Sequence, residues 1–206
     1  LISIIAKAMK VPEASVERKV LGDQDFMMQA FAACMPTFSK AYSTVVSKMG
    51  GAVSGGFEHR IKQAKSSWGK QGSKGPFYTF RDIIGARGVT DSVASMAAAT
   101  VTIQKDFKPV AKKNYYLQNK GYNAINYNMV DGNMVFEFQL KTEVNRVEAA
   151  LSHDLIYAKE KAIVQLSDEE KKLVGLVIDV STQLSMKEWA EAFEIPMRMA
   201  HLNGAW

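Results

Sequence analysis

Two acidic side chains stand out because of where they lie in the sequence. Asp82 opens a run rich in β-forming residues, and Glu137 lies in the middle of a second such run, where glutamate is disfavoured. Strand alternation would place Glu137, Gln139 and Lys141 on one face of the second run and its apolar residues on the other. Two separated carboxylates with cations nearby are what metal-assisted phosphoryl transfer needs, because a carboxylate can hold Mg²⁺ and cations can neutralise phosphates. The alternative is a solvent-facing side of a strand with no chemical role.

Positive charge is concentrated near Asp82. Between His59 and Arg81 the chain has no acid and carries the cations Arg60, Lys62, Lys65, Lys70, Lys74 and Arg81. A second run, from Lys105 to Lys120, contains five lysines and only one acid. The net charge of +5 favours an anionic partner, but it does not choose among nucleic acid, a membrane surface and a free nucleotide. Charge alone is equally compatible with a solvated face.

The composition excludes several classes of protein. Hydrophobic residues make up 47% of the 206 positions and charged residues 23%, which is typical of a globular domain and excludes a disordered chain. The single cysteine cannot form an intrachain disulfide, and the three histidines show no zinc-ligand spacing. No apolar run is long enough to cross a bilayer and the start has no signal-peptide pattern, so we expect no membrane partner. Since the first residue is Leu, we expect a piece of a longer chain or a processed one.

Periodicity and turn residues predict helices, then a small sheet, then helices. Helices are expected at 11–22, 23–49, 59–70, 91–105 and 143–160, and after Ser167 to about Leu184, with Pro36 kinking or splitting the second one. Asp91 or Ser92 is expected to cap the helix at 91–105, and 71–76 is expected to be a loop. Strands are expected within 77–89 and at 107–113, 122–130 and 134–142, the last two forming a hairpin around Asp131-Gly132-Asn133. The predicted fold class is α+β, a small mixed β-sheet flanked by helices.

We expect one domain over residues 1–206. Its N-terminal helices would occupy 1–56, the core 57–160 and the C-terminal helices 161–206.

Four short motifs occur in a specific order along the chain. They are Arg60-Ile61-Lys62 followed by Ser66 and Lys70, then Asp82-Ile83-Ile84-Gly85-Ala86-Arg87, Gly121-Tyr122, and Glu137-Phe138-Gln139-Leu140-Lys141-Thr142. In this order they resemble the R-x-K-x-x-x-S-x-x-x-K, D-I-x-G-x-R, N-G-Y and E-[IV]-Q-I-R-T motifs of the RelA/SpoT-type alarmone synthetases, which make (p)ppGpp. The run 152–157 is similar to the E-H-K-L-N-Y stretch of small, synthetase-only members. The resemblance covers about 60–159, and it rests on the order of the motifs rather than on any one of them.

The resemblance implies a fold, a reaction and residue roles. The fold would be nucleotidyltransferase-like with extra helices at both ends, and the reaction would transfer the β,γ-pyrophosphate of ATP to the 3′-hydroxyl of a purine nucleotide. Asp82 and Glu137 would be the catalytic and Mg²⁺-binding residues, with Glu137 as the general base. ATP would be held by Arg60, Lys62, Ser66, Lys70 and Arg87, and the acceptor by Tyr122, Gln139, Lys141 and His153.

The chain departs from the family pattern mainly on the acceptor side. Lys120 stands where the family has Asn, Asn126 where it has His, and Lys141 where it has Arg. The acceptor is therefore expected to be either an adenosine or a guanosine nucleotide, giving (p)ppApp or (p)ppGpp. Some members that make (p)ppApp are toxin domains delivered between bacteria, so the site of action is expected to be the cytoplasm, reached from another cell if this is such a toxin, with an immunity or regulatory protein as a further partner.

Two alternatives from other functional classes remain open. One is a catalytically inactive module on the same fold that binds nucleotides, RNA or a protein through the basic face, although a nucleic-acid partner is not favoured. The other is a nucleotidyltransferase that releases pyrophosphate. The polar strand face from Glu137 to Thr142 argues against both, because neither needs that set of side chains.

Overall fold

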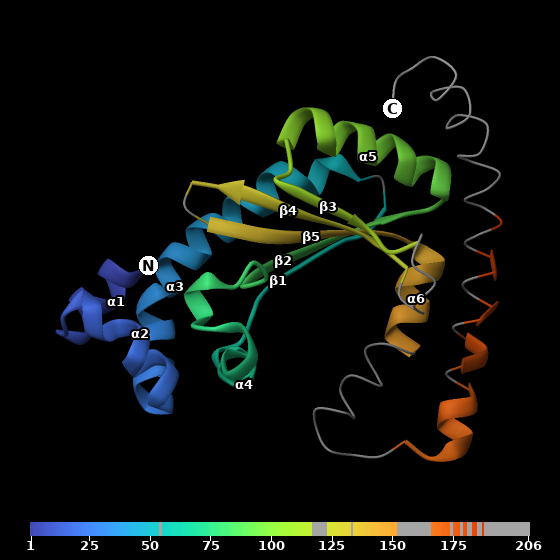
Figure 1. Cartoon of the computed structure of the whole chain (residues 1–206). Helices are drawn as coiled ribbons and strands as arrows, with labels where there is room; N and C mark the ends of the chain where they lie inside the picture. The colour runs from blue at the N-terminus through green and yellow to red at the C-terminus, as the bar shows by residue number, and fades with distance from the viewer. Residues whose placement is uncertain are drawn as a thin grey trace. The chain divides into compact units, whose positions relative to one another are not determined.

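A five-stranded sheet carries the strand motifs (Figure 1). In the computed structural model, which describes residues 1–53, 55–116, 123–132, 134–151, 166–173, 175–177, 179–180, 183–184 and 187, the strand order is β1-β2-β5-β4-β3. The strands are β1 (Phe57–Ile61), β2 (Ile84–Thr90), β3 (Ala111–Asn114), β4 (Ile125–Asp131) and β5 (Met134–Thr142). The helices and sheet confirm the predicted α+β class.

Strands β1 and β2 run antiparallel, whereas β2 and β5 run parallel. Backbone bonds from Lys62 N to Ile83 O and from Val89 N to Gly56 O pair the antiparallel strands. On the other side of β2, Arg87 bonds the side chain of Gln139 and Thr90 Oγ1 bonds the carbonyl of Lys141, so residue numbers rise together along β2 and β5. The sheet is therefore mixed, as predicted.

The predicted hairpin between β4 and β5 is present. Gly132 has a φ of +57°, a left-handed conformation that glycine adopts without a steric penalty, and this allows the tight turn after β4. Along β5, Phe136, Phe138 and Leu140 are buried, whereas Glu137 and Gln139 between them are partly exposed. The alternation predicted from the sequence is confirmed, with one apolar face and one polar face.

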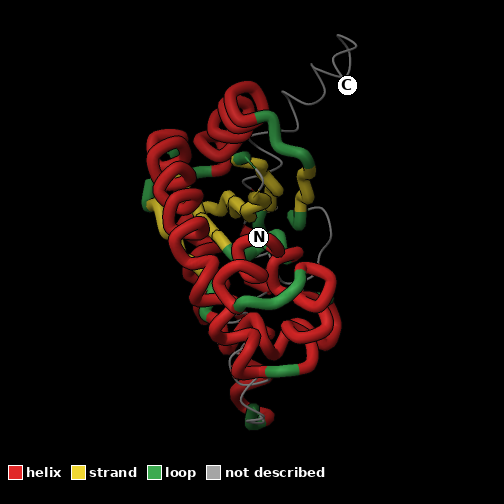
Figure 2. Tube along the Cα trace, turned by 90° about the vertical axis from the view of Figure 1, so that its left-hand side faces the viewer, coloured by secondary structure: helices red, strands yellow, loops and turns green. Residues whose placement is uncertain are grey.

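The first fifty residues form three helices: α1 (Ile2–Met9), α2 (Glu13–Gly22) and α3 (Gln24–Met49). Figure 2 shows helical turns around the N-terminus, and α3 contacts α1, α2 and α4 (Ala64–Lys74). Phe31 and Phe38 of α3 pack their rings against Phe77. Asp23 caps α3 by accepting a hydrogen bond from Phe26 N at 3.0 Å.

The prediction was that Pro36 kinks or splits the helix; helix α3 continues through Pro36, so the proline does not split it. A proline inside a helix removes one hydrogen bond and costs about 3 kcal/mol. Buried residues lie on both sides of it, including Phe31, Cys34, Phe38 and Val45, and their burial holds the two halves in one helix.

The predicted helix over 59–70 and loop over 71–76 are also corrected. Residues 57–61 form β1, and α4 begins only at Ala64 and continues to Lys74, where Gly75 with a φ of +80° ends it. Strand β1 lies at the edge of the sheet and its three central side chains are exposed. It therefore has no apolar alternation by which a sequence could reveal it, and pairing with β2 overrides its local preference.

Helix α5 (Val93–Phe107) begins as predicted, because Ser92 Oγ accepts a hydrogen bond from Ser95 N at 3.1 Å. The helix ends two residues later than the predicted 105, at Phe107, and is followed by Lys108, which has a φ of +44°, so β3 starts later than the predicted 107–113. Helix α6 (Glu143–Leu151) follows β5 directly. The rest of the predicted helix to residue 160 lies outside the described residues.

The predicted cap at Ser167 is confirmed. Ser167 Oγ accepts from Glu170 N at 3.2 Å, and Glu170 Oε2 accepts from Ser167 N at 2.8 Å, which together form a capping box. Helical residues follow from 168 to 173. Among the described residues, none of the helices combines the length and the hydropathy that a membrane span requires.

The chain forms two compact units. The first consists of Leu1–Gly50, Glu58–Ala86 and Asn128–Phe138, and the second of Gly51–Phe57, Arg87–Tyr127 and Gln139–Trp206. Strands β1, β2, β4 and β5 each contribute residues to both.

Candidate active site

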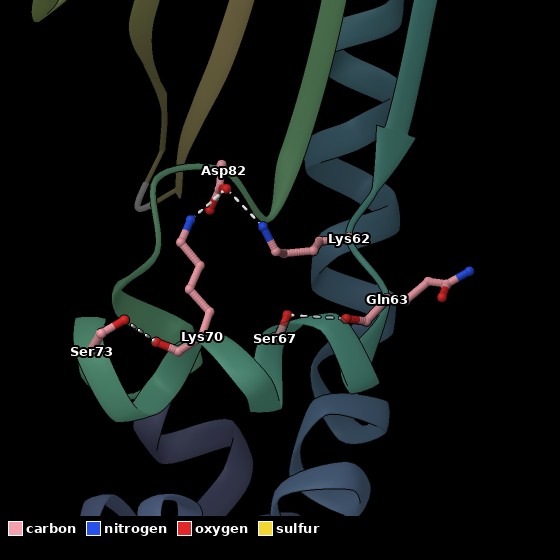
Figure 3. Close-up of polar contacts among 6 residues, drawn as sticks. All are labelled: Lys62, Gln63, Ser67, Lys70, Ser73 and Asp82. Carbon is pink, nitrogen blue, oxygen red and sulfur yellow. Dashed lines mark hydrogen bonds and ion pairs between the residues drawn. The ribbon is translucent and has the colours of Figure 1, made fainter. Parts of the chain in front are cut away.

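The first unit brings three predicted site residues together around one carboxylate (Figure 3). Asp82 Oδ2 accepts hydrogen bonds from Lys62 Nζ and Lys70 Nζ, each at 2.7 Å. Lys62 directly follows β1, Lys70 lies on α4, and Asp82 precedes β2. The backbone bond from Lys62 N to Ile83 O holds the two ends of this pairing beside each other. We call Lys62, Lys70 and Asp82 the Asp82 cluster.

Burial and charge act in opposite directions on Asp82. Burial raises the pKa of its carboxyl, but the hydrogen bonds from Lys62 and Lys70, together with their charges, outweigh it and bring the pKa below its ordinary value. Burial lowers the pKa of Lys62, whose side chain is only 7% exposed. Asp82 is therefore ionised at neutral pH, and the cluster of two ammonium groups and one carboxylate is cationic.

The second oxygen of Asp82 decides whether a cation fits here. Asp82 Oδ1 is buried and accepts no hydrogen bond among the described residues. An ionised carboxylate oxygen of this kind suits Mg²⁺, which typically takes one or two protein carboxylates and completes its shell with water and substrate phosphates. Within the described part of the chain, no three His, Cys, Asp or Glu side chains are grouped as a metal site.

Arg60 and Ser66, also predicted to contact ATP, belong to the same unit. The Arg60 side chain is exposed and lies across Gly85, where a Cβ would stand 3.7 Å from Arg60 Nε. Ser66 lies one helical turn before Lys70 on α4 and so shares its face of the helix.

Glu137, the predicted general base, is partly exposed on the polar face of β5 and belongs to the first unit as well. All the predicted side chains of this unit thus come from β1, α4, β5 and the segments that flank β1 and β2.

In the second unit, Arg87 and Gln139 meet. Arg87 Nε donates to Gln139 Oε1 at 3.4 Å, which joins a predicted ATP ligand to a predicted acceptor ligand. Lys141 also belongs to this unit and its side chain is fully buried. Tyr122 and His153, predicted to bind the acceptor, lie outside the described residues.

Sequence reasoning missed one set of polar residues in the second unit. Tyr116, Asn123, Thr142, Asn145 and Glu148 are all at least 97% buried and bond with one another. We call them the Asn145 network. The spacing Thr142, Asn145, Glu148, directly after a strand, is the signal that could have revealed it, because residues three apart at a helix start share one face.

Comparison with known protein families shows to which family this chain belongs. Residues 59–162 match the model described as the region found in RelA/SpoT proteins, which is half of the chain. The chain belongs to the RelA/SpoT family. The matched region contains every residue of the Asp82 cluster, Glu137, and the whole sheet apart from the first two residues of β1. As a member of this family the chain is an enzyme, a nucleotide pyrophosphokinase.

Solved structures show the same fold. A GTP pyrophosphokinase family protein from Streptococcus pneumoniae matches this RelA/SpoT protein with a TM-score of 0.61 at 18% identity, over 80% of this chain and 93% of that one. Small alarmone synthetase 1 from Bacillus subtilis, bound to its product pppGpp, matches with a TM-score of 0.61 at 17% identity, over 82% and 93%. Small alarmone synthetase 2 from Bacillus subtilis gives 0.56 at 18%, over 84% and 99%. No curated protein sequence matches significantly.

Proposed function

We propose that this RelA/SpoT protein transfers the β,γ-pyrophosphate of ATP to the 3′-hydroxyl of a purine nucleotide, giving AMP and an acceptor that is two phosphates heavier. The observation that carries the proposal is the Asp82 cluster, in which one carboxylate oxygen is held by two ammonium groups and the other is buried without a hydrogen bond. This combination suits a polyphosphate that binds together with a cation, because the ammonium groups would neutralise phosphate oxygens and the carboxylate would hold the metal.

Different residues of the chain are proposed to contact the phosphates of ATP and the metal ion. Lys62 and Lys70 are proposed to neutralise the transferred phosphates, with Arg60, Ser66 and Arg87 as further ATP ligands. Asp82 and Glu137 would hold Mg²⁺, which supplies charge neutralisation on the phosphate oxygens when it is bound. Phosphoryl transfer depends mainly on such positioning and on charge stabilisation.

Glu137 is proposed to act on the acceptor. The 3′-oxygen of the acceptor forms a bond to the β-phosphorus of ATP, the bond from that phosphorus to the oxygen of AMP breaks, and the Glu137 carboxylate takes the hydroxyl proton. Its place on the polar face of β5 supports this role, because a glutamate there is held by a rigid strand and keeps partial access to solvent.

The test is a product assay. The purified protein is incubated with Mg²⁺ and ATP, alone and with ADP, GDP or GTP, and nucleotides are resolved by anion exchange with mass detection. AMP together with a nucleotide two phosphates heavier supports the proposal. Release of inorganic pyrophosphate would indicate a nucleotidyltransferase, and the absence of any product would indicate a binding module.

Glu137→Gln tests the role of the base. We expect kcat to fall by about a thousandfold, the range that loss of a general base produces, while ATP binding stays close to wild type. Glu143→Gln is the matched control, because Glu143 pairs with Arg146 at the surface and has no role in the proposed site. Turnover of Glu137→Gln near the wild-type rate would remove Glu137 from the mechanism.

The acceptor is proposed to be an adenosine or a guanosine nucleotide, bound by Tyr122, Gln139, Lys141 and His153. The same assay identifies it, because only the true acceptor gains two phosphates. A toxin role would additionally require that production of the wild-type chain in a bacterial cytoplasm stops growth and that the Glu137→Gln chain does not.

A further inference from the structure

Helix α4 carries Lys70, but it buries no large apolar side chain that would hold it in place. Within α4, every residue of which is described, the two buried side chains are Ser67 and Gln71, and both are polar. Trp68, its one large apolar residue, is only partly buried. The Ser67 hydroxyl donates to the carbonyl of Gln63, a local bond at the start of the helix (Figure 3). Gln71 is therefore the buried side chain of α4 that can tie the helix to other segments.

Gln71 joins α4 to two such segments. Its side chain is only 4% exposed, its Nε2 donates to the carbonyl of Val20 at 3.0 Å, and its Oε1 accepts from Phe77 N at 2.9 Å. Because a backbone N–H can only donate and a backbone carbonyl can only accept, one orientation of the Gln71 amide satisfies both partners. The amide is therefore fixed at its oxygen and at its nitrogen.

Both partners of Gln71 belong to packed parts of the first unit. Val20 lies in the last turn of α2, where carbonyl groups have no partner within the helix, and its side chain is buried. Phe77 is completely buried, and its ring packs against Phe31 and Phe38 of α3. Two hydrogen bonds to the backbone of such segments set both the distance of α4 from them and its rotation about its own axis.

The rotation of α4 determines where Lys70 points. Consecutive residues of an α-helix lie about 100° apart around its axis, so with Gln71 directed inward Lys70 lies at the border of the buried face. The Lys70 side chain is 33% exposed, and its Nζ donates to Asp82 Oδ2 at 2.7 Å. The same nitrogen lies 5.2 Å from the centre of the Phe80 ring. A shift or rotation of α4 would move this ammonium group away from Asp82.

We propose that Gln71 is a positioning residue that holds α4 so that Lys70 meets the phosphates of ATP. This rests on the proposed function, in which Lys70 neutralises those phosphates. Gln71 itself contacts no substrate, because its amide is buried and bonded to the backbone. Its loss is expected to weaken ATP binding and to leave acceptor binding nearly unchanged, since Gln139 and Lys141 belong to the second unit.

The main variant is Gln71→Met, which is similar in length and removes both hydrogen bonds. Binding is measured with Mg²⁺ and an ATP analogue that has a methylene bridge between its α- and β-phosphates, because this analogue cannot undergo the proposed transfer. We expect its Kd to rise by about tenfold, the effect of losing much of one hydrogen bond from a charged donor. The KM for the acceptor is expected to stay within about twofold of wild type, because the loss concerns ATP.

Asp23→Ala is the matched control. It removes the hydrogen bond from Phe26 N that caps α3, so it also destabilises the first unit, but the bond that it removes does not involve α4. Its Kd for the analogue is expected to stay within about twofold of wild type at a temperature where circular dichroism shows both variants folded. If Gln71→Met does not fold, Gln71→Asn replaces it, because an amide shortened by one methylene group cannot reach both partners, and its Kd is expected to rise about threefold.

A second experiment tests whether Gln71 acts through Lys70. Gln71→Met is introduced into a Lys70→Met chain, and the Kd for the analogue is compared with that of Lys70→Met alone. We expect a further rise of less than about twofold, because a misplaced helix costs little once the ammonium group is absent. A general loss of stability would instead weaken binding by the same factor in both backgrounds.

The outcomes separate the role of Gln71 from the proposed function. An unchanged Kd in folded Gln71→Met overturns the positioning, as would an equal rise in Asp23→Ala or an equal rise with and without Lys70. If the wild-type chain binds the analogue but forms no product from ATP, the proposed reaction is wrong, and the binding constants decide the role of Gln71 alone. A wild-type chain that does not bind the analogue overturns both.

Discussion

Asp82 shares one carboxylate oxygen between two lysines, an arrangement that ties local stability to the proposed chemistry. The two lysines lie 8 residues apart in the sequence and reach the carboxylate from different elements, so the cluster also connects α4 to the end of β1. Removal of the carboxylate would leave two neighbouring ammonium groups without their shared counter-ion, one of them buried.

Asp82→Asn is therefore expected to lower the free energy of unfolding by about 2 kcal/mol at neutral pH and to abolish turnover. Asp131→Asn is the matched control, because it breaks an ion pair of 3.2 Å with Lys48, whose side chain is 58% exposed, and pairs with an exposed partner contribute about 1 kcal/mol or less. Urea denaturation of both variants measures the difference. Equal losses would mean that the Asp82 cluster is no more important for stability than a surface pair.

Cys34 is completely buried on α3, and burial raises the pKa of its thiol to about 11. A group whose pKa is higher in the folded state favours folding below its ordinary pKa, here about 9, and loses that contribution as the pH rises toward the folded value. The wild-type chain is thus expected to lose about 1 kcal/mol more stability than Cys34→Ala between pH 8 and pH 10. Parallel urea titrations of the two proteins across this range would show the difference, and identical pH profiles would contradict it.

At the scale of elements, the approach of the chain to β1 depends on one glycine. A Cβ on Gly55 would lie 2.2 Å from the carbonyl oxygen of Val89 and 2.9 Å from its carbon, both backbone atoms of β2. The next residue differs, since a Cβ on Gly56 would meet only the Val89 side chain, at 3.9 Å. Only glycine lets the backbone pass so close to β2 at position 55.

Gly55→Ala is expected to lower the free energy of unfolding by about 2 kcal/mol or more, because the backbone must move to relieve the overlap. Gly56→Ala, its neighbour, should stay within about 0.5 kcal/mol of wild type. Thermal denaturation followed by circular dichroism compares the two. A Gly55→Ala protein as stable as Gly56→Ala would show that the segment before β1 is easily displaced.

The elements that the sequence predicts correctly have local signals. In the β4–β5 hairpin, buried and exposed side chains alternate along β5 and a cluster of turn residues separates the strands. Helix α5 and the helix after Ser167 each begin with a serine whose side chain accepts a hydrogen bond from the backbone N–H three residues later. Strand β1 has none of these, because it is a polar edge strand defined by its partner β2. That Pro36 does not split α3 could not be predicted locally, because the packing that offsets its cost involves residues distant in the sequence.

The site residues also divide into those that local patterns identify and those that they do not. The motifs identified Lys62, Lys70 and Asp82 individually, but their meeting at one oxygen depends on how β1, α4 and β2 are arranged, and no local pattern specifies that. Asn145 and Glu148 were missed because polar residues near a helix start ordinarily face solvent. Only the burial of α6 shows that these two do not.

At the scale of the whole molecule, the two compact units are not independent lengths of chain. Strands β1, β2, β4 and β5 each have residues in both units, so neither unit contains all of the strands. Unfolding of one unit would remove strand pairing from the other, which favours a single cooperative transition.

We therefore expect two probes of urea denaturation to give the same midpoint. Circular dichroism at 222 nm reports the helices of both units, whereas alkylation of Cys34, the only thiol of the chain, reports the first unit. Exposure of Cys34 at a clearly lower urea concentration would show that the first unit unfolds separately and that the shared strands do not couple the two.

The buried Asn145 network has a consequence for how this part of the enzyme can change in evolution. Its five side chains bond with one another, so replacing one of them by an apolar residue deprives a buried neighbour of a hydrogen-bond partner. Changes at these positions are therefore expected to occur in pairs rather than singly.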